Sequence, residues 1–253
     1  MQLRGPGAIL FSKQILRRQL RHAGLQARIP LKLLQLEQRH RIARLNWSFT
    51  HRWTIQQWRN VMFTDESRFR RFHADGRVRV YRRRGERFLN DVILETKAFG
   101  GGSVMVWAGI SLGGRTDLVF VDGTLTAQRY VDEILRSHVL PYLGAIGQAA
   151  IFQDDNARPH RGRVALGFLE NHGISHMEWP AVSPDLNPIE HLWDMLERRV
   201  RPLITPACTL PELRRLLTQE WDRIPQRAID RLIRSMRGRI NECLMRQGGH
   251  THY

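Results

Sequence analysis

The sequence predicts an α/β fold, a mixed sheet flanked by helices on both faces, with further helical segments at both ends of the chain. Three observations support this prediction. Apolar strand patterns come first, helix and strand patterns then alternate, and helical patterns close the chain. With 253 residues and 42% hydrophobic residues, the chain is long enough for one large domain or two small ones and can bury a core.

The N-terminal part carries a short basic helix. Ser12 is expected to cap it and Gly24 to end it, because serine accepts hydrogen bonds from the first turn and glycine readily adopts the left-handed conformation after the last. A helix of this length is not stable alone. A second helix is predicted over 36–49. Its polar side is expected to carry Arg39, Arg41 and Arg44.

The core is predicted to begin near Trp58. Strands are expected over 61–64 (ending at Asp65), 78–81, 103–110, 118–121, 149–153 and 176–179. Helices are expected over 126–142 with a break at Pro141, over 163–171, over 188–200 and, rich in arginine, within 210–246. Five tryptophans are expected in the core: Trp47, Trp53, Trp58, Trp193 and Trp221.

Forty Lys and Arg residues against 24 Asp and Glu residues give a formal net charge of +16. Such a surface attracts polyanions, with nucleic acid the first candidate and an anionic membrane the second. The first acidic residue is Glu37, so the N-terminus resembles a transit peptide as well as a DNA-contacting segment. Cys208 and Cys243 form neither a metal-binding pattern nor a disulfide framework, and no apolar run approaches membrane-spanning length.

Three acidic residues are candidates for catalysis. Asp65 and Asp155 follow two predicted strands, so neighbouring strands would bring them to the same edge of the sheet. Glu190 lies in the first turn of helix 188–200, whose apolar face is expected to pack on the sheet. Each has a structural alternative. The two aspartates suit turns, and Glu190 suits a capping box with Asn187.

Three converging carboxylates repel one another unless a cation lies between them. Mg²⁺ prefers oxygen ligands, and two such ions would assist an in-line displacement at phosphorus. Strand alternation places Asp154 and Asp155 on opposite faces but does not indicate which face holds the site.

Four blocks carry a family resemblance: 63–69 (FTDESRF), 101–107 (GGSVMVW), 152–160 (FQDDNARPH) and 183–193 (SPDLNPIEHLW). Together they resemble the Tc/mariner superfamily of DDE transposases. The 34 residues between Asp155 and Glu190 match its Tc branch. The resemblance implies an RNase H-like fold in which Asp65, Asp155 and Glu190 are catalytic and bind two Mg²⁺ ions, replaceable by Mn²⁺. It also implies cleavage of transposon ends, strand transfer into a TA target, a homodimer on double-stranded DNA, and work in the nucleus.

Transposases of this superfamily carry two N-terminal helix-turn-helix units that recognise the transposon ends. Here only the last helix of the second unit is expected. The resemblance therefore implies an N-terminally truncated chain with incomplete recognition of those ends. The predicted segments are a helix-turn-helix remnant (1–28), a basic linker and helix (29–55), the RNase H-like DDE domain (56–205) and an arginine-rich helical segment (206–253). Expected DNA-contacting residues are Lys13, Arg17, Arg18, Arg21, Arg82, Arg83, Arg84, Arg158 and His160. For His160 a structural hydrogen bond is the alternative, and for 82–84 a nuclear signal or a solvated hairpin tip.

Three classes of function follow: a DNA transposase, another RNase H-like nuclease, and a domesticated, non-enzymatic DNA-binding protein. Loss of one of the three acids would favour the last class, and all three are present. The sequence therefore favours the transposase.

Overall fold

The structure is a computed structural model that describes residues 12–24, 34–71, 102–205 and 207–253. The chain divides into two compact units, Met1–Gln35 and Leu36–Tyr253, which are described separately. The predicted strand 78–81 lies outside the described residues.

The first unit contains helix α1 (Lys13–His22). The Ser12 side chain accepts a hydrogen bond from the Ile15 N–H at 3.3 Å, and Gly24 adopts a φ of +74°, which glycine allows at little cost. Both ends of this helix are therefore as expected. Its apolar residues Ile15, Leu16 and Leu20 are exposed.

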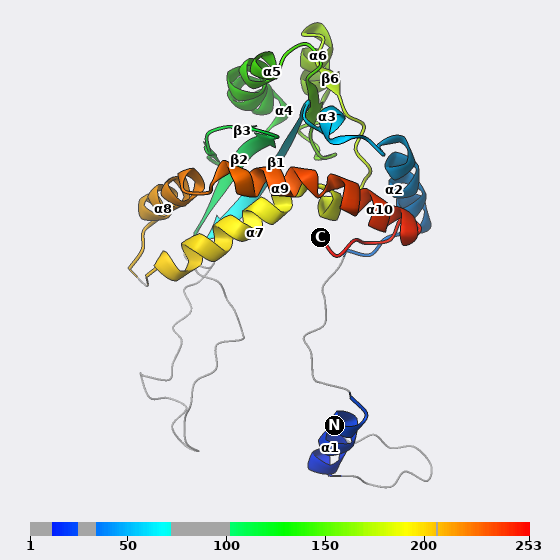
Figure 1. Cartoon of the computed structure of the whole chain (residues 1–253). Helices are drawn as coiled ribbons and strands as arrows, with labels where there is room; N and C mark the ends of the chain where they lie inside the picture. Colours follow the sequence, from blue (N-terminus) through cyan, green and yellow to red (C-terminus); the bar gives the residue numbers. More distant parts are fainter. Residues whose placement is uncertain (1–11, 25–33, 72–101, 206) are drawn as a thin grey trace. The chain divides into compact units, whose positions relative to one another are not determined.

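The second unit is built on a six-stranded mixed sheet (Figure 1). The strands are β1 (Val61–Arg70), β2 (Ser103–Ser111), β3 (Gly114–Arg115), β4 (Val119–Val121), β5 (Ile151–Gln153) and β6 (Ser175–His176). Their order is β3-β2-β1-β5-β6, with β4 paired to β2. Strands β1 and β2 are antiparallel, whereas β5 runs parallel to β1 and to β6. The predicted mixed sheet is confirmed.

Helices cover both faces of this sheet. They are α2 (Gln38–Thr50), α3 (Ile55–Trp58), α4 (Ala127–Arg129), the π-helix η4 (Tyr130–Val139), α5 (Leu140–Ile146), α6 (Arg163–Asn171), α7 (Pro188–Val200), α8 (Leu210–Asp222), α9 (Gln226–Arg234) and α10 (Met236–Met245), with 3-10 turns η5 (Pro184–Leu186) and η6 (Arg201–Leu203). Within the described ranges, no helix is long and apolar enough to cross a membrane.

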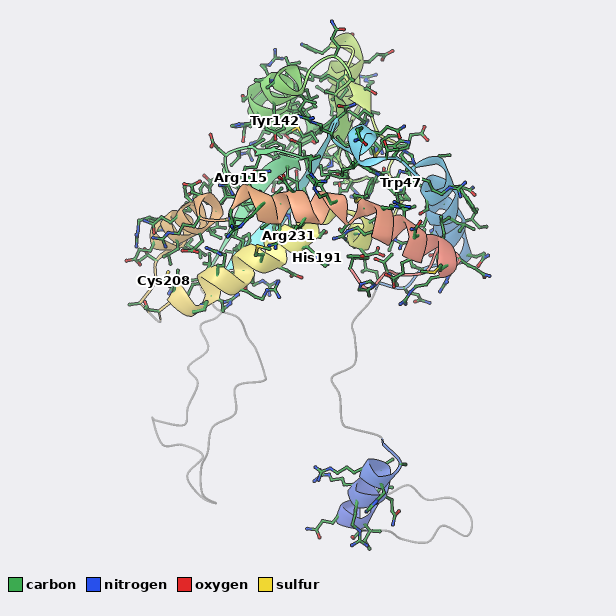
Figure 2. All side chains as sticks on the ribbon, in the orientation of Figure 1. Trp47, Arg115, Tyr142, His191, Cys208 and Arg231 are labelled. Atoms are coloured by element: carbon green, nitrogen blue, oxygen red, sulfur yellow. The ribbon has the colours of Figure 1, made fainter. Side chains whose placement is uncertain are left out.

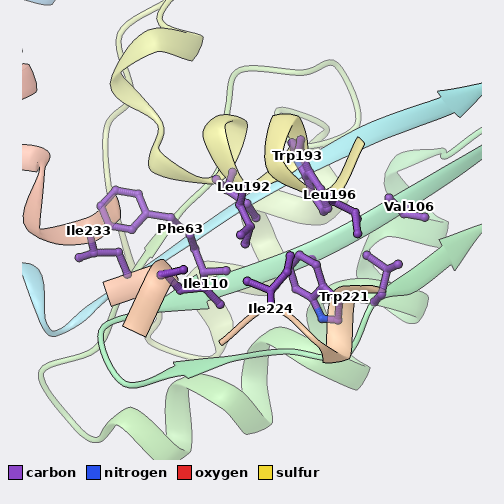
Figure 3. Close-up of a cluster of buried hydrophobic side chains, with 14 of the residues drawn as sticks. Phe63, Val106, Ile110, Leu192, Trp193, Leu196, Trp221, Ile224 and Ile233 are labelled. Atoms are coloured by element: carbon purple, nitrogen blue, oxygen red, sulfur yellow. The ribbon is translucent and has the colours of Figure 1, made fainter. Parts of the chain in front are cut away.

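One face of the sheet packs against α7, α8, α9 and α10. Figure 3 shows Phe63 and Ile110 from the strands beside Leu192 of α7, Trp221 of α8 and Ile233 of α9. All five side chains are almost fully buried, and each such burial contributes roughly 1.5–3 kcal/mol. The C-terminal helices therefore share one core with the sheet.

The other face packs against η4, α5 and α6. Met62, Trp107 and Phe152 belong to this second core. Successive residues of β1 thus alternate between the two faces, with Phe63 on the α7 side and Met62 on the η4 side. This alternation places Asp65 on the α7 face and Glu66 on the opposite one.

The first strand is longer than expected. It was predicted to end at Asp65, but β1 continues to Arg70 because β2 stays paired with it from Phe63↔Ile110 to Arg70↔Ser103. Backbone pairing with β2 overrides the polar sequence that follows Thr64. The prediction that Asp65 ends its strand is therefore wrong.

The helix expected over 126–142 continues to Ile146. Pro141 was expected to break it, but lies in the first turn of α5, directly after the π-helix. Proline has no N–H to donate and is tolerated at the start of a helical segment.

The prediction that Arg44 lies on the polar side of its helix is wrong, because its side chain is fully buried. Its guanidinium donates two hydrogen bonds of 2.7 Å to the carboxylate of Asp185, and others to the carbonyls of Val182, Gly248 and Gly249. The C-terminal tail covers the charge, and the carboxylate compensates it. Of the five tryptophans expected in the core, Trp53 is partly buried and the other four are buried. Figure 2 labels Trp47 on α2.

Candidate active site

The junction of β1 and β5 brings two candidate carboxylates to the same level of the sheet. The last paired residues of these parallel strands are Phe63 and Gln153. Asp65 and Asp155 each come two residues later in the sequence. Thr64 reinforces the junction, since its hydroxyl donates to the Gln153 carbonyl at 2.8 Å. The expectation that the strands carrying these aspartates are neighbours is confirmed, although Asp65 lies within β1 and does not end it.

Asp65 is oriented by α7. The indole Nε1 of Trp193 donates a hydrogen bond of 2.9 Å to Oδ2 of Asp65. Burial, followed by the negative charges of Glu190 and Glu66, raises the pKa of Asp65 well above its usual value, although the Trp193 hydrogen bond acts in the opposite direction. Asp65 therefore lies in a region of crowded, poorly compensated negative charge.

Asp155 is held by a histidine and a backbone N–H. Nδ1 of His160 lies 2.8 Å from Oδ1 of Asp155, and the Ala157 N–H donates to the same oxygen at 2.7 Å. Burial would raise the pKa of Asp155, but these hydrogen bonds outweigh it and lower the pKa below its usual value. Asp155 is consequently ionised at neutral pH, with one oxygen engaged.

Glu190 lies in the first turn of α7, which is anchored beside Asp65. The Asn187 side chain caps the helix by accepting from the Ile189 N–H at 3.4 Å, and its Nδ2 donates to the Thr64 carbonyl at 3.1 Å. The capping box considered for Glu190 does not form. Burial, followed by the charges of Asp194 and Asp155, raises the pKa of Glu190 to about 7.

Asp154, the alternative to Asp155, faces the other side of the sheet. It is 1% exposed, accepts from the Tyr130 hydroxyl at 3.2 Å, and lies 2.9 Å from Nε2 of His176. These contacts make it a structural residue of the η4 layer. Asp155 therefore remains the candidate of this pair.

Glu66 is a part of the site that sequence reasoning missed, and His160 connects it to Asp155. Nε2 of His160 lies 3.2 Å from Oε1 of Glu66, so the ring bridges Glu66 and Asp155. Burial would lower the pKa of His160, but hydrogen bonds with Asp155 and Glu66 outweigh it and raise the pKa to about 11. Glu66 directly follows Asp65 in the matched block, which was the available signal.

The three carboxylates suit a hard divalent cation as a donor set, because all their ligand atoms are oxygens. The negative charges of Glu190 and Asp155 raise the pKa of Asp65, and the charge of Asp155 also raises the pKa of Glu190. In the described part of the chain, no three His, Cys, Asp or Glu side chains already stand in an arrangement able to hold a metal ion. Hydrogen bonds occupy Oδ2 of Asp65 and Oδ1 of Asp155.

The predicted DNA-contacting residues are only partly accessible. Arg17, Arg18 and Arg21 are exposed on α1, which Lys13 begins, and Arg158 is exposed after β5. The segment 82–84 lies outside the described residues. His160 was expected to contact DNA, but is 2% exposed, with both ring nitrogens engaged. The structural hydrogen bond, its alternative role, is the one observed.

Comparison with known proteins identifies the class. A family model described as DDE superfamily endonuclease matches residues 60–209. A paired-end complex of Mos1 transposase with the left transposon end has a TM-score of 0.77 at 18% identity, covering 94% of this chain and 71% of that one. The catalytic domain of Mos1 mariner transposase has a TM-score of 0.65 at 16% identity, covering 88% of this chain and 100% of that one. These structures show that the fold is RNase H-like.

Sequence relatives identify the family. The Tcb2 transposase of Caenorhabditis briggsae is 35% identical over 255 residues, and the Tc1 transposase of Caenorhabditis elegans 33% over 255 residues. In both cases the match covers 100% of this chain and 92% of the relative. The chain belongs to the DDE superfamily endonucleases and, within them, to the Tc1-like DNA transposases.

Proposed function

We propose that Asp65, Asp155 and Glu190 are the catalytic carboxylates of this transposase. The matched position of Asp65 and Asp155, two residues beyond the last β1–β5 pair, carries the proposal. Glu190 adds to it because Asn187 fastens the start of α7 to the backbone just before Asp65. Mutual electrostatic effects connect the three groups, as expected for ligands that share a cation.

Asp65, Asp155 and Glu190 would hold two divalent cations, Mg²⁺ or Mn²⁺ in its place. Structures of the Mos1 catalytic domain with raltegravir were obtained with Mn and with Mg, which supports this choice of metal. When bound, such ions activate the attacking oxygen and stabilise the leaving oxygen of a phosphodiester.

The chain's own residues prepare this site. Trp193 orients Asp65 through its indole N–H, and His160 with the Ala157 N–H orients Asp155. Asn187 determines where α7 begins, and so where Glu190 lies. These contacts reduce the conformational freedom that metal binding would otherwise remove.

The proposed substrate is double-stranded DNA, cut at transposon ends and joined to a TA target by a homodimer in the nucleus. The +16 charge supports DNA as the partner. Mos1 transposase structures that include a transposon end and a strand transfer complex support both steps.

A strand-transfer assay with pre-cut ends tests this proposal. We expect products with Mg²⁺ or Mn²⁺ and none with a chelator, and Asp155→Asn should lose activity by orders of magnitude. Asp132→Asn is the matched control, because Asp132 is exposed on η4. Activity should survive this change.

Normal activity of the Asp155→Asn variant would show that Asp155 is not a catalytic residue. DNA binding without metal-dependent cutting by the parent chain would instead indicate a domesticated DNA-binding protein. Cutting of any duplex without joining would indicate another RNase H-like nuclease.

A further inference from the structure

Helix α9 and the start of α10 carry a row of four exposed arginines. We call this the α9 row: Arg227, Arg231, Arg234 and Arg237. Figure 2 labels Arg231 on the helix that crosses the front of the view. Within α9, the spacing of four and three residues keeps Arg227, Arg231 and Arg234 on one helical surface, and Arg237 follows three residues later in α10.

The fold exposes this row by burying the opposite side of α9. Ala228, Ile229 and Ile233 pack into the core shared with the sheet. Because these apolar residues determine which way the helix faces, the arginines between them must point to solvent. No feature of the core requires them to be arginine.

The α9 row is not neutralised by the protein. Among the described residues, none of its four guanidinium groups has an acidic partner, whereas Arg199 and Arg223 both pair with Glu220. Asp230, the one acidic residue within α9, is engaged by the Gly113 N–H and by the Gln226 side chain, both at 2.9 Å. The row therefore presents four uncompensated positive charges.

The C-terminal end of the row borders a cavity of about 670 Å³. Arg234 and Arg237 line it together with Arg52, from the segment between α2 and α3. Trp53 and Asn241 also line it. Arg52 thus adds a positive charge from outside α9 and α10 to the C-terminal end of the row.

We propose that the α9 row binds the phosphate backbone of duplex DNA, at a surface separate from the carboxylates. This inference rests on the proposed function, since it concerns how a DNA-cutting enzyme holds its substrate. Arg227 and Arg234 are seven residues apart, so they span roughly 10 Å along the helix, the length of about three nucleotides of one strand. Arginine suits this contact because its planar fork matches phosphate oxygens.

The test measures the affinity of the full chain for a 30-base-pair duplex over a series of salt concentrations. In the row variant, all four arginines become glutamine: R227Q, R231Q, R234Q and R237Q. Each lost phosphate contact lowers the slope of log affinity against log salt by about 0.9, so we expect a decrease of roughly 3 to 4. Sequence preference should not change.

The matched control also replaces four arginines by glutamine, and so has the same net charge. Each of its arginines pairs with a carboxylate in the structure: Arg39, Arg136, Arg214 and Arg223. We expect its slope to stay within about 1 of the parent slope. An equal loss in both variants would show that only overall charge matters, and would overturn the assignment to the α9 row.

A second measurement keeps the proposal testable if the row variant folds poorly. Cys208 and Cys243 are buried, so an R231C variant can carry a photoactivatable crosslinker on an exposed thiol. It should crosslink to the duplex, whereas the same probe in R136C, on the η4 layer, should not. Equal crosslinking at both positions would contradict the proposal. So would a row variant that loses binding to anionic vesicles but keeps the parent slope of log affinity for DNA against log salt.

These outcomes are independent of the proposed function. If the parent chain binds DNA through the row but neither cuts nor joins it, the catalytic proposal fails and the proposal that the α9 row binds DNA is retained. If it cuts and joins while the row variant keeps the parent slope, the surface proposal fails and the catalytic one remains.

Discussion

Nδ1 of His160 lies 2.8 Å from Oδ1 of Asp155, inside a buried network that continues to Glu66. The imidazolium compensates two carboxylates at once, and its raised pKa of about 11 keeps it charged at neutral pH. A positive charge therefore lies beside one of the carboxylates proposed to hold a divalent cation.

The first prediction concerns His160→Gln. Removing the imidazolium removes its repulsion toward a bound divalent ion, which at close range amounts to a few kcal/mol. We expect tighter Mn²⁺ binding by titration, but slower strand transfer, because Asp155 loses the contact that orients it. His22→Gln, on the exposed helix α1, is the control. Weaker Mn²⁺ binding in His160→Gln would show that the histidine organises the metal ligands more than it competes with the metal.

The second prediction concerns Glu190→Gln. Glutamine keeps the shape of the side chain but removes the charge that a hard cation requires. We expect the fold and DNA binding to remain, while metal-dependent cleavage and joining fall by orders of magnitude. Glu170→Gln, on the exposed side of α6, should behave like the parent. Normal cutting by the Glu190→Gln variant would exclude Glu190 from catalysis.

The third prediction concerns pH. Glu190 has a pKa of about 7 against an ordinary 4.5, so the folded state binds a proton that the unfolded chain releases between these values. His160, with a pKa raised from 6.5 to about 11, contributes stability in full below pH 6.5 and loses it as pH rises toward 11. Both effects lower the free energy of unfolding as pH rises.

Urea unfolding of the metal-free chain at pH 5.5 and 8.5 measures this dependence. We expect lower stability at pH 8.5, and a smaller difference in Glu190→Gln, which lacks the titration between 4.5 and 7. Added Mg²⁺ should stabilise the parent more at pH 8.5, where protons no longer compete. An equal pH dependence in the parent and in Glu190→Gln would contradict the raised pKa of Glu190.

The fourth prediction compares two tryptophans that stack with ring centroids 5.6 Å apart, Trp193 and Trp221. The indole of Trp193 donates to Asp65, whereas that of Trp221 donates to the Thr116 carbonyl at 3.1 Å. Trp193→Phe should weaken Mn²⁺ binding by about tenfold, as loss of a contact behind a metal ligand typically does. Trp221→Phe should reduce only the free energy of unfolding. Similar metal affinities in the two variants would refute the positioning role of Trp193.

The fifth prediction concerns the buried pair of Arg44 and Asp185. Arg44→Met leaves the Asp185 carboxylate without its cation and should lower the free energy of unfolding by about 3–5 kcal/mol. Replacing both residues, with Arg44→Met and Asp185→Leu, should recover part of this loss. Arg39→Met removes an exposed pair with Glu37 and should cost no more than about 1 kcal/mol. Equal costs in chemical denaturation would show that burial of Arg44 contributes nothing.

The sequence by itself determined the elements whose residues form a regular local pattern. Helix α7 has the predicted bounds, because Asn187, Pro188 and the apolar residues that follow are local signals for a helix start. The predicted strands 103–110 and 118–121 appear within one residue as β2 and β4. The three acidic residues proposed to be catalytic were also selected from the sequence, because they lie in the blocks that resemble the transposase family.

Only the tertiary structure decided the features that depend on distant residues. Pairing with β2 extends β1 past Asp65, and contacts with Tyr130 and His176 place Asp154 on the opposite side from the site. Arg44 is buried because Asp185 and the C-terminal tail surround it, although its own helix gives no sign of this. Periodicity reports which face of an element is apolar. It carries no information about which charged group of a remote segment will form an ion pair with a given side chain. The presence or absence of that ion pair determines whether burying the side chain stabilises or destabilises the fold.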